Sequence, residues 1–288
     1  MSQPESPPRA GRPKPPMTKA RLERLVTDWQ KSSGQPVARL NLRIAAMMIA
    51  GALARVVGPD DRAAFAIKGG IAMELRLGDR ARATRDIDLV LRGNTDRFAD
   101  LLDAGLGEPY NGFAFRRREI GDHPVRTDVK QVELQVIFAH KVLCTPKLEI
   151  APAETGHEEF AALPGARLDA VGLDGPELVQ VLATPWQIAQ KLHAVTERYS
   201  AGRENPRVRD LIDIQLLEAT DPDIRKVRDA CEQVFASRGQ HSWPPDLDVP
   251  PGWTAGYETI ATALAFPVTD LNDAADAVRR YIKRIAHA

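Results

Sequence analysis

Cysteine, charge of one sign and long apolar runs are all scarce in this chain of 288 residues. The two cysteines, Cys144 and Cys231, stand in no metal-ligand spacing, which fits a reducing cytosol and indicates structural rather than reactive thiols. Lys+Arg and Asp+Glu both number 39, so no global basic field attracts nucleic acid or an anionic membrane, and any polyanion needs a local patch. The most apolar run, residues 44–54, is too short to span a bilayer. The sequence therefore predicts a soluble, cytoplasmic protein that makes no contact with a membrane.

The order of patterns along the chain predicts two folded parts after a tail. Residues 1–17 are rich in proline, serine and charge and lack the apolar core of a signal peptide, so we expect a disordered tail. Strands mixed with helices over residues 18–165, followed by a mainly helical stretch over 166–288, predict an α+β fold with a helical second domain. The elements expected in the first part are helices within 18–57, a strand over 64–67, a helix over 71–77, a strand over 87–91, a helix beginning near Thr95, and strands within 112–120 and 127–138.

Helix signals punctuate the second part. Thr184, Pro185 and Gln187 combine an N-cap, a proline at the first helical position and a capping-box partner. Asn205 and Pro206 start the next helix in the same manner. A final helix is predicted from an apolar stripe made up of Leu271, Ala275, Val278, Ile282 and Ile285.

Two aspartates one residue apart, Asp86 and Asp88, begin the strand "DIDLVL". Side chains two apart on a strand share a face, so the two carboxylates lie side by side. They repel each other unless a cation lies between them, and Mg²⁺ takes one or two carboxylates together with phosphate oxygens and water. The pair predicts a metal–nucleotide site; the alternative is two strand-edge aspartates paired with Arg82 or Arg85.

A glycine pair, Gly69–Gly70, stands between the preceding strand and its helix. Backbone N–H groups of such a turn and of the helix N-terminus can hold a phosphate, although an ordinary tight turn has the same sequence. Strand, glycine pair, helix, loop and D-x-D strand, in the wording "IKGGIAMELRLGDRARATRDIDLVL", resemble the first motif of the nucleotidyltransferase superfamily. The chain is similar in particular to the AbiEii/MenT branch, toxins of type IV-like toxin–antitoxin and phage-defence systems.

A second block, "PWQIAQKLHAV…NPRVRDLIDI", is similar to helical motifs of the same branch. The resemblance implies that Lys191 is the lysine that contacts the nucleotide phosphates and that Asp213 is the later catalytic aspartate, with Asp210 as its close rival. Lys191 borders an apolar helix stripe, so its stem can pack while its ammonium reaches a ligand. The alternatives are a surface lysine and aspartates that pair with Arg207 or Arg209. The nucleotide-binding residues that the resemblance implies are Lys68, Gly69, Gly70, Thr84, Arg85 and Asp210.

The third metal carboxylate of the superfamily has no aspartate to match it. The resemblance places this ligand on a later strand of the same sheet, where "VELQVIF" offers Glu133, and we therefore predict Asp86, Asp88 and Glu133 as the metal ligands. Thr84 matches a residue that resembles a phosphorylation switch where the antitoxin is kinase-like; the alternative is a β-branched residue that enters a strand. His193 is predicted to be exposed.

The resemblance implies a Mg²⁺-dependent enzyme that transfers a nucleoside monophosphate from an NTP, a pyrimidine nucleotide being possible, to RNA, most plausibly a tRNA 3′ end, and that a co-encoded antitoxin silences. DNA is not expected as a partner. Arginines that can meet RNA phosphates are Arg80, Arg82, Arg85 and the run from Arg116 to Arg118, although they can equally form a solvated face. Two alternatives remain open: a small molecule or protein hydroxyl as the acceptor, and a degenerate fold that binds a nucleotide or a partner without catalysis.

Overall fold

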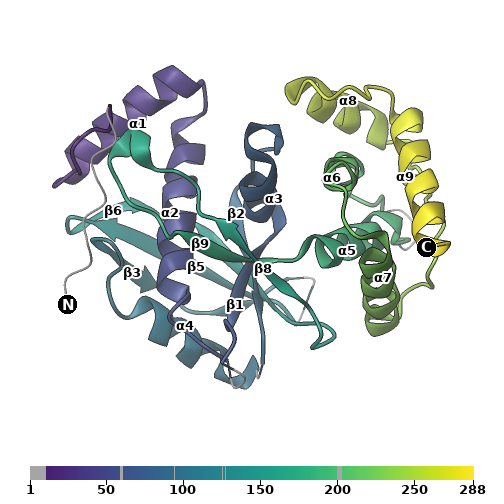
Figure 1. Cartoon of the computed structure of the whole chain (residues 1–288), viewed down its shortest axis with the longest axis horizontal. Helices are drawn as coiled ribbons and strands as arrows, with labels where there is room; N and C mark the ends of the chain where they lie inside the picture. The colour runs from purple at the N-terminus through teal and green to yellow at the C-terminus, as the bar shows by residue number, and fades with distance from the viewer. Residues whose placement is uncertain (1–10, 59–60, 94, 125, 127, 200–202) are drawn as a thin grey trace. The chain divides into compact units, whose positions relative to one another are not determined.

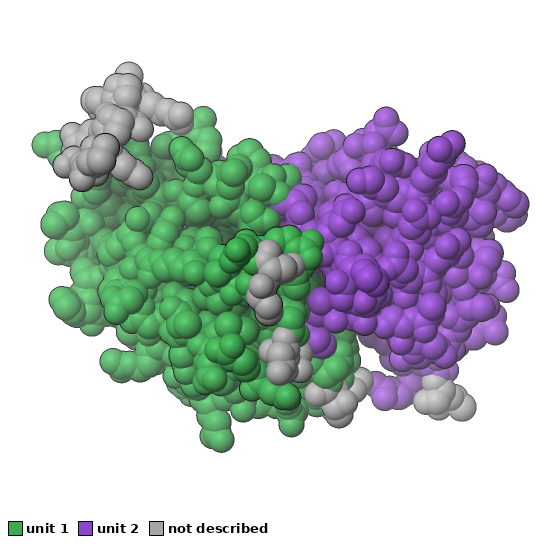
Figure 2. Space-filling model, turned by 60° about the horizontal axis from the view of Figure 1, so that its bottom comes forward, with its two compact units in different colours: residues 1–67, 83–151, 162–180 green, residues 68–82, 152–161, 181–288 purple. Residues whose placement is uncertain are grey.

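The computed structural model describes residues 11–58, 61–93, 95–124, 126, 128–199 and 203–288. It divides into two compact units that are each assembled from three stretches of the chain (Figure 2). Unit 1 consists of residues 1–67, 83–151 and 162–180, and unit 2 of residues 68–82, 152–161 and 181–288. The two units are described separately below.

Unit 1 begins with two helices that sequence pattern predicted. Helix α1 (Lys19–Ser33) starts at the N-cap Thr18, whose side chain accepts a hydrogen bond from the N–H of Arg21, and it ends at Gly34 with a positive φ of 71°. Helix α2 (Val37–Leu53) is apolar almost all round and is largely buried, as its composition predicts. Residues 11–17 have described positions, although they were predicted to be part of a disordered tail: Arg12 pairs with Asp174 at 2.7 Å, and Pro16 is buried. The rest of that predicted tail, residues 1–10, lies outside the described residues.

The strands form a nine-stranded mixed sheet in the order β3-β5-β7-β2-β1-β9-β8, with β4 and β6 paired to β5. This arrangement confirms the predicted class, a mixed sheet with N-terminal and C-terminal helices. The strands are β1 (Phe65–Lys68), β2 (Asp86–Leu91), β3 (Phe113–Arg117), β4 (Gly121–Asp122), β5 (Lys130–Phe138), β6 (Lys141–Cys144), β7 (Lys147–Pro152), β8 (Phe160–Pro164) and β9 (Leu178–Leu182).

Strand β5 determines the register of one side of the sheet. Its first half pairs antiparallel with β7, where Gln131 lies opposite Glu149 and Val132 opposite Leu148. Its second half pairs antiparallel with β3, where Gln135 lies opposite Arg116. Alternate residues of β5 are buried, as a strand with one apolar face requires.

Helices α2 and α4 (Phe98–Leu106) lie over one face of the sheet in unit 1 (Figure 1). They pack closely, because a Cβ on Gly105 would lie only 2.8 Å from Leu53 Cδ2. A 3₁₀ turn, η2 (Thr95–Arg97), precedes α4, and a second one, η3 (Asp169–Val171), lies near α1. On β5 the buried side chains lie on this helix-covered face, because Arg117, which lies opposite Leu134, reaches Asp103 of α4.

Unit 2 is mainly helical. It contains α3 (Gly69–Leu77), the 3₁₀ turn η1 (Gly78–Arg80), α5 (Thr184–Thr196), α6 (Arg209–Glu218), α7 (Ile224–Arg238), α8 (Trp253–Ala263) and α9 (Leu271–Ala286). Helix α5 packs against α6 and α7, and α9 packs against α6, α7 and α8. The predicted apolar stripe of α9 is buried in the common core, which confirms that helix and its orientation.

One strand of the sheet, β9, falls within residues 166–288, which were predicted to be mainly helical. The domain boundary proposed at residue 165 stays a prediction. No single helix among the described residues is long and apolar enough to cross a membrane; α1 and α2 reach that length and composition only as a pair bent by 117°.

Candidate active site

A glycine turn joins β1 to α3. Gly69 has a φ of +60°, a left-handed conformation that other residues adopt only with strain, so glycine is required there. Gly70 follows in the first turn of α3 and is buried. The first N–H groups of a helix have no partner within the helix, and this turn therefore offers donors for an anion.

The side chain of Gln187, on α5, anchors this turn. Its Nε2 donates to the carbonyl oxygen of Gly69 at 3.0 Å, and its Oε1 accepts from Nη1 of Arg76 at 2.6 Å. Arg76 also donates to the carbonyl oxygen of Leu182. The capping-box prediction for Gln187 is therefore wrong: the side chain contacts α3 instead of its own helix, and α5 has no side-chain cap.

The two aspartates of β2 lie as alternation predicts. Ile87 and Leu89 are buried, whereas Asp86 and Asp88, which alternate with them, are half-buried on the opposite face of the strand. Thr84 donates its hydroxyl to the carbonyl oxygen of Asp86 at 3.3 Å, so this hydroxyl is engaged at the entrance to the strand. The phosphorylation switch at Thr84 stays a prediction.

Glu133, on β5, stays a prediction as the third metal ligand, and β7 is the strand that neighbours β2 on that side of the sheet. Glu133, on β5, is exposed and pairs with Nε of Arg118 at 3.2 Å. Glu149, on β7, is half-buried; it accepts a hydrogen bond from Gln131 at 3.0 Å and forms an ion pair with Lys147 at 3.2 Å. Sequence reasoning missed Glu149, although "KLEI" carries the period-two signal of a strand.

The arginine run on β3 is divided between the two faces of the sheet. Arg117 points to the helix-covered face, where it forms a bidentate pair with Asp103 of α4, both distances being 2.6 Å. This pair lowers the pKa of Asp103 and raises that of Arg117. Arg116 lies opposite Gln135 on the polar face and is exposed, and Arg118 lies on the same face through its pair with Glu133.

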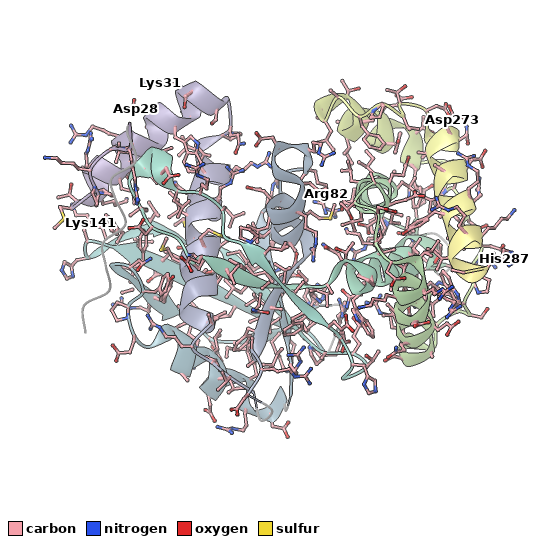
Figure 3. The ribbon with its side chains drawn as sticks, in the orientation of Figure 1. Asp28, Lys31, Arg82, Lys141, Asp273 and His287 are labelled. Atoms are coloured by element: carbon pink, nitrogen blue, oxygen red, sulfur yellow. The ribbon has the colours of Figure 1, made fainter. Side chains whose placement is uncertain are left out.

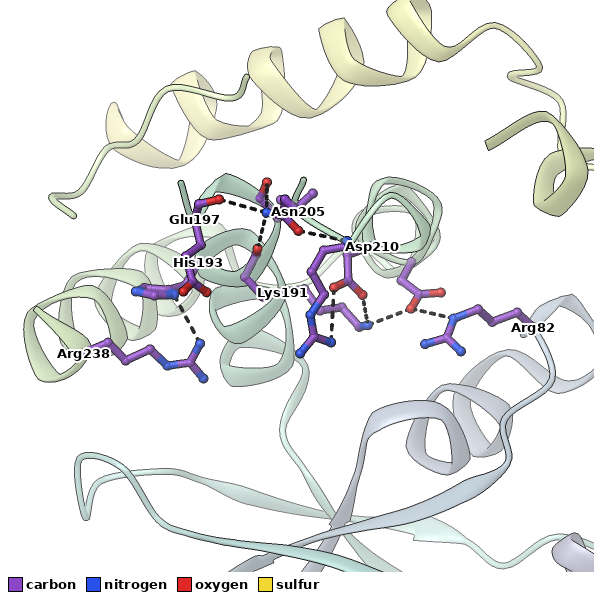
Figure 4. Close-up of polar contacts among 11 residues, drawn as sticks. Arg82, Lys191, His193, Glu197, Asn205, Asp210 and Arg238 are labelled. Atoms are coloured by element: carbon purple, nitrogen blue, oxygen red, sulfur yellow. Dashed lines mark hydrogen bonds and ion pairs between the residues drawn. The ribbon is translucent and has the colours of Figure 1, made fainter. Parts of the chain in front are cut away.

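Lys191 forms the centre of a charged cluster inside unit 2 (Figure 4). Its Nζ donates to Oδ1 of Asp210 and to Oδ2 of Asp213, both at 2.7 Å. Nε of Arg82 donates to the same Oδ2 of Asp213 at 3.1 Å, and Arg82 is labelled in Figure 3 as well. Lys191 is only 9% exposed, so it is not the surface lysine of the alternative interpretation, and Asp213 is fully buried. Of the two arginines proposed as alternative partners of the aspartates, Arg207 lies 4.0 Å from Asp210.

The cluster favours the charged forms of Lys191 and Asp213. Burial lowers the pKa of Lys191, but Asp210 and Asp213 outweigh that effect, and the pKa is raised above its ordinary value. Burial raises the pKa of Asp213, but Lys191 and Arg82 outweigh it, and the pKa is lowered. Oδ1 of Asp213 is buried and accepts no hydrogen bond from any described residue.

Two further side chains of unit 2 differ from prediction. Asn205 does not start a helix; its Nδ2 donates to the carbonyl oxygens of Ala194, Val195 and Glu197 and so caps the end of α5, while α6 begins only at Arg209. His193 was predicted to be exposed but is fully buried. Its Nδ1 lies 3.2 Å from Nη1 of Arg238, and its ring lies 4.4 Å from that of His241.

The burial of His193 lowers its pKa to about 3, with Arg238 and His241 acting in the same direction. The imidazole is therefore neutral at pH 7. A helix face that looked solvent-exposed in sequence is covered by α7 and by the segment that follows it, which the local pattern could not show.

The predicted site residues are thus distributed over both units. Thr84, Arg85, Asp86, Asp88 and Glu133 belong to unit 1, whereas Lys68, Gly69, Gly70, Lys191, Asp210 and Asp213 belong to unit 2. Within the described residues, no group of three acidic, histidine or cysteine side chains lies close enough to hold a metal ion. Two half-buried carboxylates on one strand face nevertheless match the donor set of Mg²⁺, which completes its shell with phosphate oxygens and water.

Fold and sequence both indicate a nucleotide-transferring enzyme. The family model of the nucleotidyl transferase AbiEii toxin, of a type IV toxin–antitoxin system, matches residues 51–283. The chain therefore belongs to the AbiEii nucleotidyltransferase toxin family. No curated protein matches the chain.

One solved structure, that of MenT4, supports the fold, and two further nucleotidyltransferases resemble the chain more weakly. MenT4, a nucleotidyltransferase toxin from Mycobacterium tuberculosis H37Rv, is 16% identical with a TM-score of 0.54, and the alignment covers 94% of this chain and 98% of MenT4. A putative nucleotidyltransferase from H. pylori is 16% identical with a TM-score of 0.40, covering 86% of this chain and 94% of that one. An antigenic nucleotidyltransferase-like protein from Paracoccidioides brasiliensis is 16% identical with a TM-score of 0.36, covering 78% and 91%. At these identities the likeness concerns the fold alone.

Proposed function

We propose that this toxin transfers a nucleoside monophosphate from an NTP to RNA, with a tRNA 3′ end as the acceptor, in a Mg²⁺-dependent reaction in the cytoplasm. The observation that carries the proposal is the order glycine turn, helix and D-x-D strand inside a member of a nucleotidyltransferase toxin family. A cognate antitoxin is the expected partner, because the family belongs to a toxin–antitoxin system.

The residues have the following roles in the proposal. Asp86 and Asp88 hold Mg²⁺, which when bound supplies positive charge to the triphosphate. The N–H groups at Gly69 and Gly70 receive phosphate oxygens. Lys191 is proposed to approach the phosphates with the N–H that is left after its two bonds to aspartates.

The proposed reaction transfers a nucleotidyl group from the NTP to an acceptor hydroxyl. The oxygen of an acceptor hydroxyl attacks the α-phosphorus and forms a new P–O bond. The bond from the α-phosphorus to the oxygen that bridges it to the β-phosphate breaks, and pyrophosphate leaves with that electron pair. The hydroxyl proton passes to solvent or to a carboxylate, for which Glu149, on the strand beside β2, is our candidate.

RNA as the acceptor is supported by exposed cations on the polar face of the sheet. Arg116 and Arg118 lie on this face, and Arg85 is exposed just before β2. A local patch of this kind can bind phosphates even though the whole chain has no net charge. Arg117, which is paired with Asp103 on the other face, is not part of it.

The test incubates the purified protein with each α-labelled NTP, Mg²⁺ and total RNA, and then locates the label. We expect one NTP to label an RNA of tRNA size, and the variant Asp86→Ala/Asp88→Ala to transfer nothing while it keeps its fold. The matched control is Asp122→Asn, an exposed aspartate paired with Lys130. Label on a small molecule or a protein would refute the RNA acceptor, and no transfer to any acceptor would refute the activity.

A further inference from the structure

Gln187 connects a buried arginine to the glycine turn. It is 2% exposed, and its carboxamide makes two hydrogen bonds, from Arg76 at 2.6 Å and to the carbonyl oxygen of Gly69 at 3.0 Å. A glutamine that served only to fill space could be any apolar residue of the same size. Here both ends of the amide are occupied, inside one compact unit.

The orientation of this amide is determined by chemistry. A guanidinium has donors and no acceptor, so the oxygen of Gln187 must face Arg76 and the NH₂ group must face Gly69. Arg76 donates to two neutral oxygens, those of Gln187 and Leu182, and burial lowers the pKa of Arg76 to about 10. The guanidinium therefore determines which way the glutamine points.

The bond to Gly69 has a consequence for Gly70. The carbonyl of Gly69 and the N–H of Gly70 belong to one planar peptide unit and point in opposite directions. A donor that holds the carbonyl oxygen therefore fixes the direction of the Gly70 N–H. Helix α3 begins at Gly69, so the helix also holds this carbonyl, and Gln187 adds a side-chain donor at a position where glycine, with a φ of +60°, allows more conformations than any other residue.

We infer that Gln187 is a positioning residue for nucleotide binding: it holds the Gly69–Gly70 peptide so that the Gly70 N–H points at the phosphates of the NTP. Arg76 acts one step further away by orienting Gln187. This inference rests on the proposed function, because the glycine turn is the element proposed to receive the phosphates. Gln187 itself makes no contact with the nucleotide in this scheme.

The decisive variant is Gln187→Glu. A carboxylate still accepts from Arg76, and more strongly because the bond is then charge-assisted, so the protein is expected to remain folded. It has no N–H to donate to Gly69, and the turn loses its anchor. We expect KM for the NTP to rise about 2- to 12-fold, the equivalent of one ordinary hydrogen bond, with a smaller change in kcat.

The matched control is Gln190→Glu, the same substitution three residues further along α5. Gln190 donates to Glu154 at 3.1 Å and has no bond to the glycine turn, so this variant should lose stability and keep the KM of the wild type. Hydrogen exchange gives a second measurement, in which Gln187→Glu should speed the exchange of the Gly70 amide and Gln190→Glu should not.

The outcomes separate the two proposals. A wild type that transfers no nucleotide overturns the proposed function and this inference together. A wild type that transfers nucleotide, with Gln187→Glu matching Gln190→Glu in KM and in Gly70 exchange, overturns the inference alone. A raised KM with faster Gly70 exchange, seen only in Gln187→Glu, supports it.

Discussion

Replacement of Lys191 by methionine should destabilise unit 2 strongly. The ammonium makes two bonds of 2.7 Å to Asp210 and Asp213, whose side chains are almost completely buried. Without it, two carboxylates remain in the interior with Arg82 and the distant Arg207 as their cationic partners, the latter at 4.0 Å. Loss of one partner of a buried ion pair costs about 3–5 kcal/mol, and we expect a loss of that size in the free energy of unfolding.

This expectation differs from what the helix pattern alone suggests. A lysine at the border of an apolar stripe, with its ammonium in solvent, would cost little stability when it is removed. For a chain of this size the predicted loss corresponds to a fall in Tm of about 6–20 °C. Urea unfolding followed by circular dichroism at pH 7 measures the free energy directly, and the slope of the transition shows whether unfolding remains cooperative.

A triple variant provides the control. In Lys191→Met/Asp210→Asn/Asp213→Asn no buried carboxylate is left unpaired, so roughly half or more of the lost stability should return. If Lys191→Met stays within about 1 kcal/mol of the wild type, the reasoning about stability is refuted, and a collapse of NTP affinity in the same variant would leave the ammonium with its nucleotide role alone.

The pH dependence follows from the same cluster. The raised pKa of Lys191 means that its contribution is fully present below its unfolded value of about 10.4 and is lost as pH rises through the folded value. The lowered pKa of Asp213 means that its contribution is present above about 3.9 and is lost as pH falls through the folded value. Lys191→Met should flatten the alkaline limb of the stability profile.

Three further outcomes are expected. Arg116→Ala/Arg118→Ala should reduce the slope of log RNA affinity against log salt by roughly 0.7–0.9 for each phosphate that the variant no longer binds, and it should leave NTP binding unchanged. Glu149→Gln should slow nucleotide transfer more than Glu133→Gln, because Glu149 lies on the strand that neighbours β2; single-turnover rates measure the difference. Stability should fall as pH drops from about 6.5 towards about 3, because buried His193 resists protonation, and His193→Gln should weaken this dependence in acid titration of the folded state.

Each of these three predictions has a result that would contradict it. Arg117→Ala, on the helix-covered face, is the control for Arg116→Ala/Arg118→Ala. If both variants change the salt slope equally, the face of the sheet on which an arginine lies does not matter for RNA binding. Equal rates in both glutamate variants would remove Glu149 from the chemistry. Arg238, His241 and Glu154 surround or contact the histidine network, so an unchanged acid profile in His193→Gln would assign the acid sensitivity to them.

The local sequence pattern correctly predicted those features that residues close together in the sequence determine. The alternation of β2 correctly predicted that Asp86 and Asp88 share a face, and the stripe of α9 correctly predicted its buried side. Local pattern failed where the partner of a polar side chain lies far away along the chain. Gln187 looks like a helix cap, but its partner Gly69 is 118 residues away.

Lys191 shows the same limit. Its partners lie on the next helix, and Arg82, which completes the cluster, is 131 residues from Asp213. No spacing rule connects such positions. Glu133 on β5 was predicted as the third carboxylate because strand order cannot be read from one sequence. In the structure β7 lies between β5 and β2, so Glu149 of β7 is a further candidate.

The interleaving of the two units has a consequence for how this toxin is made. Strand β9 (Leu178–Leu182) lies between β1 and β8 in the sheet, so a nascent chain that has not yet emerged past residue 182 carries β1 as an open edge. Unit 2 likewise needs residues 68–82 from early synthesis and the last helices from its end. Neither unit can close on the ribosome until most of the chain has been translated, and such long-range pairing is slow. A truncated mRNA would therefore yield an incomplete sheet that is sensitive to proteases, and not a partially active toxin.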